Sequence, residues 1–223
     1  MILFDCDGVL VDSEILSCGT DAHLMSEAGH PITAEDLIRR FIGHPKKAIW
    51  AALAEERGKP WPEGLLERAE TLLMERLRTE LEPVEGVAAA VAAISGPRAV
   101  ASSSSLAKLD VALTRCGLRD VFAPHIYSAE QVARGKPAPD VFLFAASQVG
   151  ADPQNCIVIE DSVAGVQAAR KAGMRVVGFT GGRHSYPSHG DRLMEAGAVH
   201  VVRHMRELPD CVAFLRRNAL PAA

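Results

Sequence analysis

Short apolar runs separated by helical patterns recur through most of the chain, and this alternation limits the fold more than any other feature. The runs are continuously apolar rather than alternating in polarity, which is typical of strands buried on both faces of a sheet. We expect strands at residues 2–4, 98–101, 125–127, 156–159, 176–179 and 199–202. Because helical patterns lie between successive strands, the sequence predicts an α/β fold with a parallel sheet and helices on both faces.

One long stretch contains no such run. From residue 15 to residue 82, apolar residues recur at helical spacing, and Gly29 and Gly58 act as stop signals between the helical patterns. An all-helical stretch between strands indicates an insertion. We therefore expect an α/β core of residues 1–14 and 83–223 and an inserted helical domain of residues 15–82.

Composition excludes several classes of function. The chain has 223 residues, of which 48% are hydrophobic and 23% charged, as expected for a soluble globular protein with a sizeable core. Its net charge of −4 argues against a nucleic-acid surface, which needs a broad basic patch. No run reaches the roughly 18 to 20 apolar residues of a membrane span, so we expect no membrane partner. The amino terminus lacks the basic start of a signal peptide, which favours a cytoplasmic protein.

The cysteines also bear on the compartment. There are five of them, an odd number, and no two form a Cys-x-x-Cys pair, which favours a reducing environment. Cys6 and Cys156 lie in apolar runs, where a cysteine behaves as a small buried hydrophobic residue. Nothing in the sequence indicates an oligomeric state.

Asp5 and Asp7 follow the first apolar run directly, in Asp5-Cys6-Asp7-Gly8. Residues two apart in a strand share one side, so the two acids would repel each other unless a cation neutralised them. Gly8 lets the backbone turn sharply close to a bound ligand. The pattern suggests a nucleophile and a proton-transfer group at a metal site, although two aspartates capping a turn or a helix would have the same spacing.

Three further segments are expected to place polar side chains at the same rim of the sheet. A serine run beginning at Ser102 follows a predicted strand and opens a helix, which is a favourable place for an anion. Lys136 lies between a glycine and two prolines, which would hold its charge in a fixed position. Glu160 and Asp161 follow the most apolar strand, where adjacent acids are tolerated if a hard cation such as Mg²⁺ binds them. In open α/β sheets ligands bind outside the carboxyl ends of the strands, so we expect all of these residues to meet.

Each of these segments also has an ordinary structural explanation. The serine run could form a loop and a helix cap, Lys136 could be a solvated loop lysine, and Asp161 or Ser162 could simply cap the next helix. All of these explanations would have to hold together for the shared site to be wrong.

The chain resembles the haloacid dehalogenase superfamily in four motifs taken in order: Asp5-Cys6-Asp7-Gly8-Val9-Leu10-Val11-Asp12-Ser13, the strand-terminal Ser102, Gly135-Lys136-Pro137-Ala138-Pro139-Asp140, and Ile159-Glu160-Asp161-Ser162. The resemblance covers nearly the whole chain and is strongest to the β-phosphoglucomutase-like phosphatases, which carry a helical cap domain after the first motif. It implies a Rossmann-like core with an inserted cap. It also implies an Mg²⁺-dependent phosphomonoester hydrolase for a small phosphorylated metabolite, such as a sugar phosphate.

By the same resemblance, Asp5 is the nucleophile that forms an aspartyl-phosphate, and Asp7 is the general acid and base. Ser102 and the N–H of Ser103 would hold phosphoryl oxygens, and Lys136 would offset the negative charge of the phosphate.

The resemblance also implies a set of ligands for Mg²⁺. They are the side chains of Asp5 and Asp161, the main-chain carbonyl of Asp7, and Glu160, which would bind directly or through water.

The cap would meet the part of the substrate that is not phosphate, with candidate residues after the first motif and in residues 39–46. Lys46 falls where mutase relatives carry an arginine for a second phosphate. Ser17 stands where those mutases place a histidine, and a hydroxyl cannot deliver a proton as an imidazole does. Hydrolysis is therefore favoured over the phosphomutase reaction, which would require an aspartyl-phosphate that resists water. A non-catalytic phospho-aspartate binding module is a further alternative, and it would show no Mg²⁺-dependent turnover.

Overall fold

The computed structural model describes residues 1–41 and 46–218. Its strands are β1 (Ile2–Phe4), β2 (Arg98–Ser102), β3 (Ile126–Ser128), β4 (Ile157–Glu160), β5 (Arg175–Phe179) and β6 (His200–Val202). Its α-helices are α1 (Ser13–Glu27), α2 (Ala34–Phe41), α3 (Lys46–Glu56), α4 (Leu65–Thr79), α5 (Val87–Ala93), α6 (Leu106–Arg115), α7 (Arg119–Phe122), α8 (Asp140–Val149), α9 (Val163–Lys171), α10 (His189–Ala196) and α11 (Leu208–Arg217).

The strands form one parallel sheet in the order β3-β2-β1-β4-β5-β6. The expected α/β fold with a parallel sheet is therefore confirmed. β1 lies at the centre and pairs with both β2 and β4, with Phe4 opposite Val100 on one side and Ile159 on the other. The chain adds strands outward from β1 in one direction and then starts again from β4 in the other. Such a switch point is where open α/β sheets bind ligands.

The strands are apolar along their whole length because helices cover both faces of the sheet. Leu3 packs in a buried cluster with residues of α8, α9 and α10, whereas its neighbours Ile2 and Phe4 pack with residues of α5, α6 and α11. Burying one such leucine or phenylalanine stabilises the fold by about 1.5 to 3 kcal/mol. This two-sided burial holds the strand ends in fixed positions.

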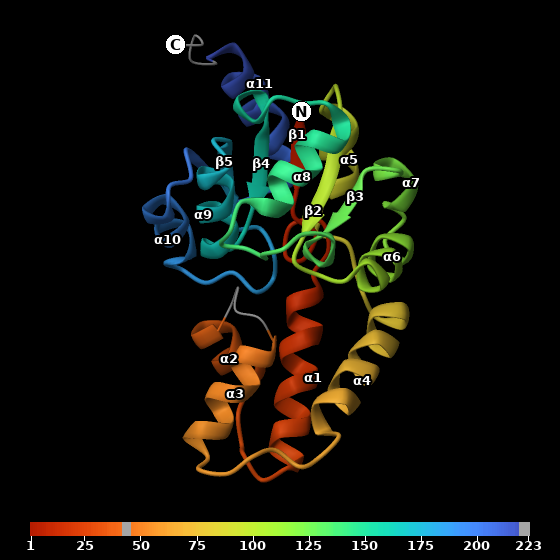
Figure 1. The fold of residues 1–223 in the computed structure, drawn as a ribbon, viewed down its shortest axis with the longest axis vertical. Helices are drawn as coiled ribbons and strands as arrows, with labels where there is room; N and C mark the ends of the chain where they lie inside the picture. Colours follow the sequence, from red (N-terminus) through yellow and green to blue (C-terminus); the bar gives the residue numbers. More distant parts are fainter. Residues whose placement is uncertain (42–45, 219–223) are drawn as a thin grey trace.

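The helices α1 to α4, which we call the helical insertion, lie beyond the carboxyl ends of the strands (Figure 1). They bury a separate apolar cluster that includes Leu24, Leu37, Trp50 and Leu53. Trp61 packs edge-on against Trp50, with ring centroids 5.3 Å apart, and its indole N–H donates to the main-chain oxygen of Trp50. The helical insertion therefore has an apolar core of its own.

The chain enters and leaves the helical insertion through two segments that are hydrogen-bonded to each other. Val11 and Pro83 form an isolated antiparallel bridge. On either side of it, the N–H of Asp12 donates to the main-chain oxygen of Glu82 and the N–H of Val84 donates to that of Leu10, each at 3.0 Å. We call residues 10–12 and 82–84 the two linkers.

Four helices of the α/β core, α5, α7, α10 and α11, were not expected from the sequence. α5 consists entirely of alanine and valine, so it has no polar face. α10 and α11 follow glycine-rich and polar segments. The strand expected at 156–159 begins one residue later, because the N–H of Cys156 closes a turn on Pro153. Among the described helices, none has both the length and the apolar content needed to cross a bilayer.

Candidate active site

The residues predicted from the strand ends meet at the switch point of the sheet. Asp5 follows β1, and its N–H still pairs with the main-chain oxygen of Ile159 in β4 at 3.0 Å. Lys136, in the loop before α8, is buried, and its Nζ lies 2.8 Å from Oδ1 of Asp5 and 2.6 Å from Oε1 of Glu160. One lysine thus bridges acids from two neighbouring strands, and it is not a solvated loop residue.

Asp5, Glu160 and Asp161 form a buried carboxylate cluster whose potential ligand oxygens all lie within 4.8 Å of one another. Burial raises the pKa of Asp5 well above its usual range; Lys136 opposes this shift, and the charges of Glu160 and Asp161 add to it. Clustered oxygens with excess negative charge are the donor set that a hard divalent cation such as Mg²⁺ prefers. The residues present therefore fit a magnesium ion.

Two glycines allow this close approach of backbone and carboxylates. Gly8 has φ +72°, and a Cβ atom there would lie 1.9 Å from Oδ2 of Asp161. At Gly165, in the first turn of α9, a Cβ atom would lie 1.8 Å from Oε1 of Glu160. Neither carboxylate could keep its place beside any other residue at these positions.

Glu160 is oriented by the residue that caps the next helix. Its Oε2 accepts hydrogen bonds from the N–H of Ser162 at 2.8 Å and from the Ser162 hydroxyl at 2.9 Å. The same hydroxyl oxygen accepts from the N–H of Gly165 and caps α9. Helix capping by Ser162 therefore coexists with the acidic site instead of replacing it.

Asp7 lies in a polar environment that the sequence reading did not foresee. Its Oδ1 lies 2.8 Å from Nζ of Lys108, and the hydroxyls of Ser13 and Ser104 donate to its carboxylate. Burial acts to raise the pKa of Asp7, but the Lys108 charge and these hydrogen bonds outweigh burial and lower it to about 2. Lys108 was missed; the available signal was its place in the first turn of the helix that follows the serine run.

The serine run forms both a loop and a helix cap. Ser102 ends β2 and is buried, and its hydroxyl oxygen accepts from the N–H of Ser104 at 3.1 Å. Ser103 is exposed. Ser105 caps α6 by accepting from the N–H of Lys108. β2 pairs with β1, so Ser102 ends the strand next to the one that Asp5 follows.

The two candidate residues in the helical insertion have different surroundings. Ser17 is half-buried on α1. Lys46, at the start of α3, forms an ion pair of 2.7 Å with the buried Asp21 of α1. Its charge is therefore matched inside the insertion. Residues 42–45 of the candidate segment 39–46 lie outside the described part of the chain.

Two histidines reach the acidic cluster, His184 from the loop between β5 and α10 and His189 from the first residue of α10. Nε2 of His184 lies 2.9 Å from Oδ2 of Asp161, and Nε2 of His189 lies 2.6 Å from the main-chain oxygen of the same residue. The sequence reading assigned no role to either histidine. The only signal was the Gly181-Gly182 pair after a predicted strand.

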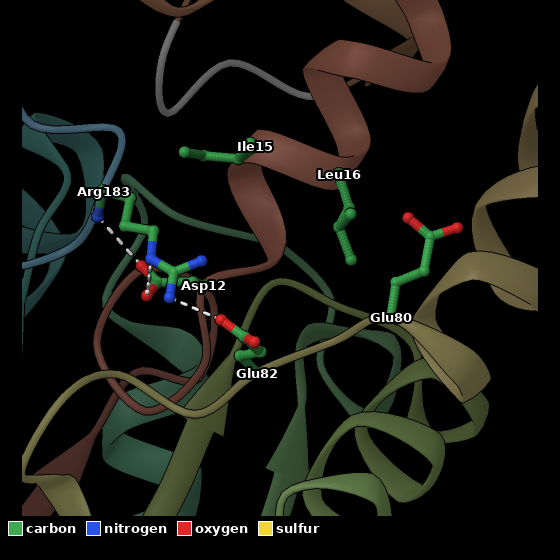
Figure 2. Close-up of a pocket in the computed structure, with 6 residues that line it drawn as sticks. All are labelled: Asp12, Ile15, Leu16, Glu80, Glu82 and Arg183. Atoms are coloured by element: carbon green, nitrogen blue, oxygen red, sulfur yellow. Dashed lines mark hydrogen bonds and ion pairs between the residues drawn. The ribbon is translucent and has the colours of Figure 1, made fainter.

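A small pocket of about 190 Å³ lies beside the linkers, next to Arg183 of the same loop. Figure 2 shows the Arg183 guanidinium between the carboxylates of Asp12 and Glu82, with Ile15 and Leu16 of α1 above them. The loop that carries His184 to the acidic cluster thus also contacts both linkers.

Known proteins resemble the chain along nearly its whole length. The family model described as haloacid dehalogenase-like hydrolase matches residues 2–179. A 6-phosphogluconate phosphatase from Escherichia coli (strain K12) is 30% identical over 94% of this chain and 92% of its own length. A solved haloacid dehalogenase-like protein from Agrobacterium tumefaciens is 46% identical, covers 96% of this chain and 97% of its own, and superposes with a TM-score of 0.90.

A second solved structure, a hydrolase of the same superfamily from Deinococcus radiodurans R1 with bound phosphate and sodium, is 32% identical. It covers 100% of this chain and 97% of its own, with a TM-score of 0.81. The family model and the curated relative match most of the chain, and the solved structures agree with the fold described above. The chain therefore belongs to the haloacid dehalogenase-like hydrolase family.

Proposed function

We propose that the chain is an Mg²⁺-dependent phosphomonoester hydrolase that acts on a small phosphorylated metabolite such as a sugar phosphate. The observation that carries the proposal is the bridge from Lys136 to Asp5 and Glu160 within the buried carboxylate cluster. Family membership and the phosphatase activity in the name of the Escherichia coli relative support it. The five cysteines are free in the structure, which agrees with the cytoplasmic location that we propose.

The first chemical step belongs to Asp5. One of its carboxylate oxygens attacks phosphorus, the ester P–O bond breaks, and an aspartyl-phosphate forms on Asp5. The side chains of Asp5, Glu160 and Asp161 and the main-chain carbonyl of Asp7 would hold Mg²⁺, which when bound supplies positive charge at the phosphoryl oxygens. Lys136 provides a second cation, held in place by its two ion pairs before substrate arrives.

Proton transfer belongs to Asp7. In the second step water attacks phosphorus, the P–O bond to Asp5 breaks, and inorganic phosphate leaves. Asp7 takes a proton from the attacking water, and the ionised form that Lys108 stabilises suits this task. In the first step Asp7 must instead give a proton to the leaving oxygen. We therefore propose that the Asp7–Lys108 ion pair loosens when the leaving group binds.

The α/β core of residues 1–14 and 83–223 would carry this chemistry, and the helical domain of residues 15–82 would close over it as a cap. Ser102 and the N–H of Ser103 would bind phosphoryl oxygens at the end of β2. Ser17 supplies no imidazole to the site, so we favour hydrolysis over the mutase reaction. The cap would exclude bulk water while the leaving group departs.

The test is a panel of phosphate esters assayed for phosphate release with and without Mg²⁺. We expect turnover that EDTA abolishes, and a loss of about 10³-fold or more in the variant Asp5→Asn. Asp210→Asn is the matched control, because Asp210 is exposed on α11. Near-normal activity in Asp5→Asn or in EDTA would show that the mechanism is wrong.

A further inference from the structure

We propose that His184 is a positioning residue that fixes the Asp161 carboxylate for Mg²⁺, and that Arg183 couples this orientation to the two linkers of the helical insertion. The inference rests on the magnesium site of the proposed function. It adds a residue pair outside the carboxylate cluster and a mechanical connection between the site and the insertion.

The first observation is the fixed position of the His184 ring. Its side chain is 1% exposed, and its Nε2 lies 2.9 Å from Oδ2 of Asp161. Within residues 1–41 and 46–218, neither buried ring nitrogen has a partner with hydrogen-bond geometry, so the ion-pair contact of Nε2 with Asp161 is the polar contact that holds the ring. Because the histidine holds Oδ2 of Asp161, the same contact also sets the position of Oδ1, the other oxygen of that carboxylate.

Two glycines leave room for the ring on either side. A Cβ atom at Gly8 would lie 2.6 Å from Cε1 of His184, and one at Gly182 would lie 2.7 Å from the same atom. The ring is thus enclosed between the turn after Asp7 and its own loop. A side chain confined in this way can set the angle of the carboxylate it touches, as partners of metal ligands commonly do.

The start of α10 holds Asp161 at a second point. His189 contacts the main-chain oxygen of Asp161 at 2.6 Å, its Nδ1 lies 3.2 Å from the Ser185 hydroxyl, and its ring stacks on Tyr186. The side chain and the backbone of Asp161 are therefore held by the loop after β5 and by the start of α10, respectively.

Arg183 ties this loop to both linkers. Its backbone N–H donates to Oδ1 of Asp12 at 2.9 Å, its Nε lies 3.6 Å from Oδ2 of the same residue, and its Nη2 pairs with Glu82 (Figure 2). Asp12 belongs to the linker that enters the insertion and Glu82 to the one that leaves it. Because Arg183 and His184 are consecutive, a movement of the linkers moves the residue that orients Asp161.

The expected consequence is a reciprocal coupling. If the position of the linkers changes the affinity for Mg²⁺, then Mg²⁺ must change the stability of the linker pairing by the same factor. A metal ion bound at Asp161 would favour one position of the helical insertion, and that position would strengthen metal binding.

Calorimetric titration of Mg²⁺ into the full chain tests the first half of the proposal. His184→Leu removes the donor, whereas His184→Gln places an amide N–H near the position of the histidine Nε2 that contacts Asp161. We expect His184→Leu to weaken Mg²⁺ binding by about 10-fold to 100-fold and His184→Gln to recover most of the loss. His23→Leu, at an exposed position on α1, is the control. Equal affinity in His184→Leu and the wild type would overturn the role of His184.

The second half is tested with Arg183→Met, and its control is Arg119→Met at another exposed ion pair. We expect Arg183→Met to weaken Mg²⁺ binding about 5-fold, at the low end of measured couplings between sites. Hydrogen exchange should show that Mg²⁺ protects the amides of Asp12 and Val84 in the wild type and not in Arg183→Met. Unchanged affinity and unchanged exchange would overturn the coupling. Failure of the wild type itself to bind Mg²⁺ would instead overturn the magnesium site of the proposed function.

Discussion

The chemistry of Asp7 depends on the residues around it and does not follow from its residue type alone. The sequence marks an aspartate two positions after Asp5, but its protonation is set by Lys108 on α6 and by the hydroxyls of Ser13 and Ser104. These partners lie up to 101 positions away in the chain. In the proposed mechanism an ionised Asp7 would act as the base, and its partners would determine when it can act as an acid.

A double-mutant cycle measures the interaction free energy between Asp7 and Lys108. In metal-free buffer at neutral pH, Lys108→Met should lower the free energy of unfolding by about 2 kcal/mol, because it leaves a largely buried carboxylate with only hydroxyl donors. The double variant with Asp7→Asn should be less destabilised than the sum of the single variants. Because the folded pKa of Asp7 is lowered to about 2, its contribution is full above its ordinary pKa of about 3.9 and is lost as pH falls through 2.

The exposed pair Arg119 and Asp110 is the control for this cycle and should show no measurable coupling. Additive effects at Lys108 and Asp7 would mean that the two charges do not interact in solution.

The thiols give a second prediction for single residues. Burial raises the pKa of Cys116 to about 11 and raises the pKa values of the other four cysteines as well. At pH 8 an ordinary thiol is about a quarter ionised, whereas Cys116 would be ionised at roughly one part in a thousand. Reaction of the native protein with a thiol reagent at pH 8 should therefore be about 10²-fold slower than that of the denatured chain. Rapid labelling of the native chain would contradict the raised pKa values of the buried thiols.

The residues that could be predicted from the sequence are those whose position follows from a strand end. Asp5, Glu160 and Asp161 come directly after apolar runs, so their meeting requires only that the strands be parallel and adjacent. Lys108 and His184 could not be placed, because their contacts depend on which way a helix faces and how a loop folds. No local pattern specifies either.

At the scale of elements, the turn after β1 and the start of α9 determine how closely backbone can approach the acids. Gly8 and Gly173 both have a positive φ. Replacing either glycine with alanine should therefore introduce a similar backbone strain of about 1 to 2 kcal/mol. Only Gly8→Ala also brings a methyl group onto Asp161; among the described residues, nothing lies within 4 Å at Gly173. We expect both variants to melt earlier, Gly8→Ala more so, and only Gly8→Ala to lose affinity for Mg²⁺.

Thermal melting measures the loss of stability from backbone strain, and calorimetric titration measures the loss of Mg²⁺ affinity from the methyl contact. If Gly173→Ala lost as much Mg²⁺ affinity as Gly8→Ala, strain alone would account for the result, and the methyl contact would not matter.

Elements with a clear apolar period could be predicted from the sequence. Elements whose structure depends on contacts with distant segments could not. The strands at β1, β4 and β5 follow from continuous apolar runs, and α8 ends at Gly150 as its sequence indicates. α5 is helical because Val87, Ala90 and Val91 bury one side against the sheet, a contact that an alanine-rich run does not reveal. The order β3-β2-β1-β4-β5-β6 likewise depends on pairings between distant segments.

For the whole molecule, the buried carboxylate cluster implies that Mg²⁺ stabilises the fold. A cation that binds only the folded chain adds about 2.7 kcal/mol when its concentration is 100 times its dissociation constant. For a protein of this size, that corresponds to a rise of roughly 5 to 10 °C in melting temperature. Melting curves in Mg²⁺ and in NaCl of equal ionic strength test it, with Asp161→Asn expected to abolish most of the difference. Equal curves in the two salts would argue against the cation site.

The paired linkers have a consequence for how such a protein can change. Both ends of the helical insertion pass through one crossing at Val11 and Pro83, so the chain leaves the α/β core and returns to it at one place. If the insertion acts as the proposed cap, grafting a different helical unit between the same two crossing points should change which leaving group is accepted.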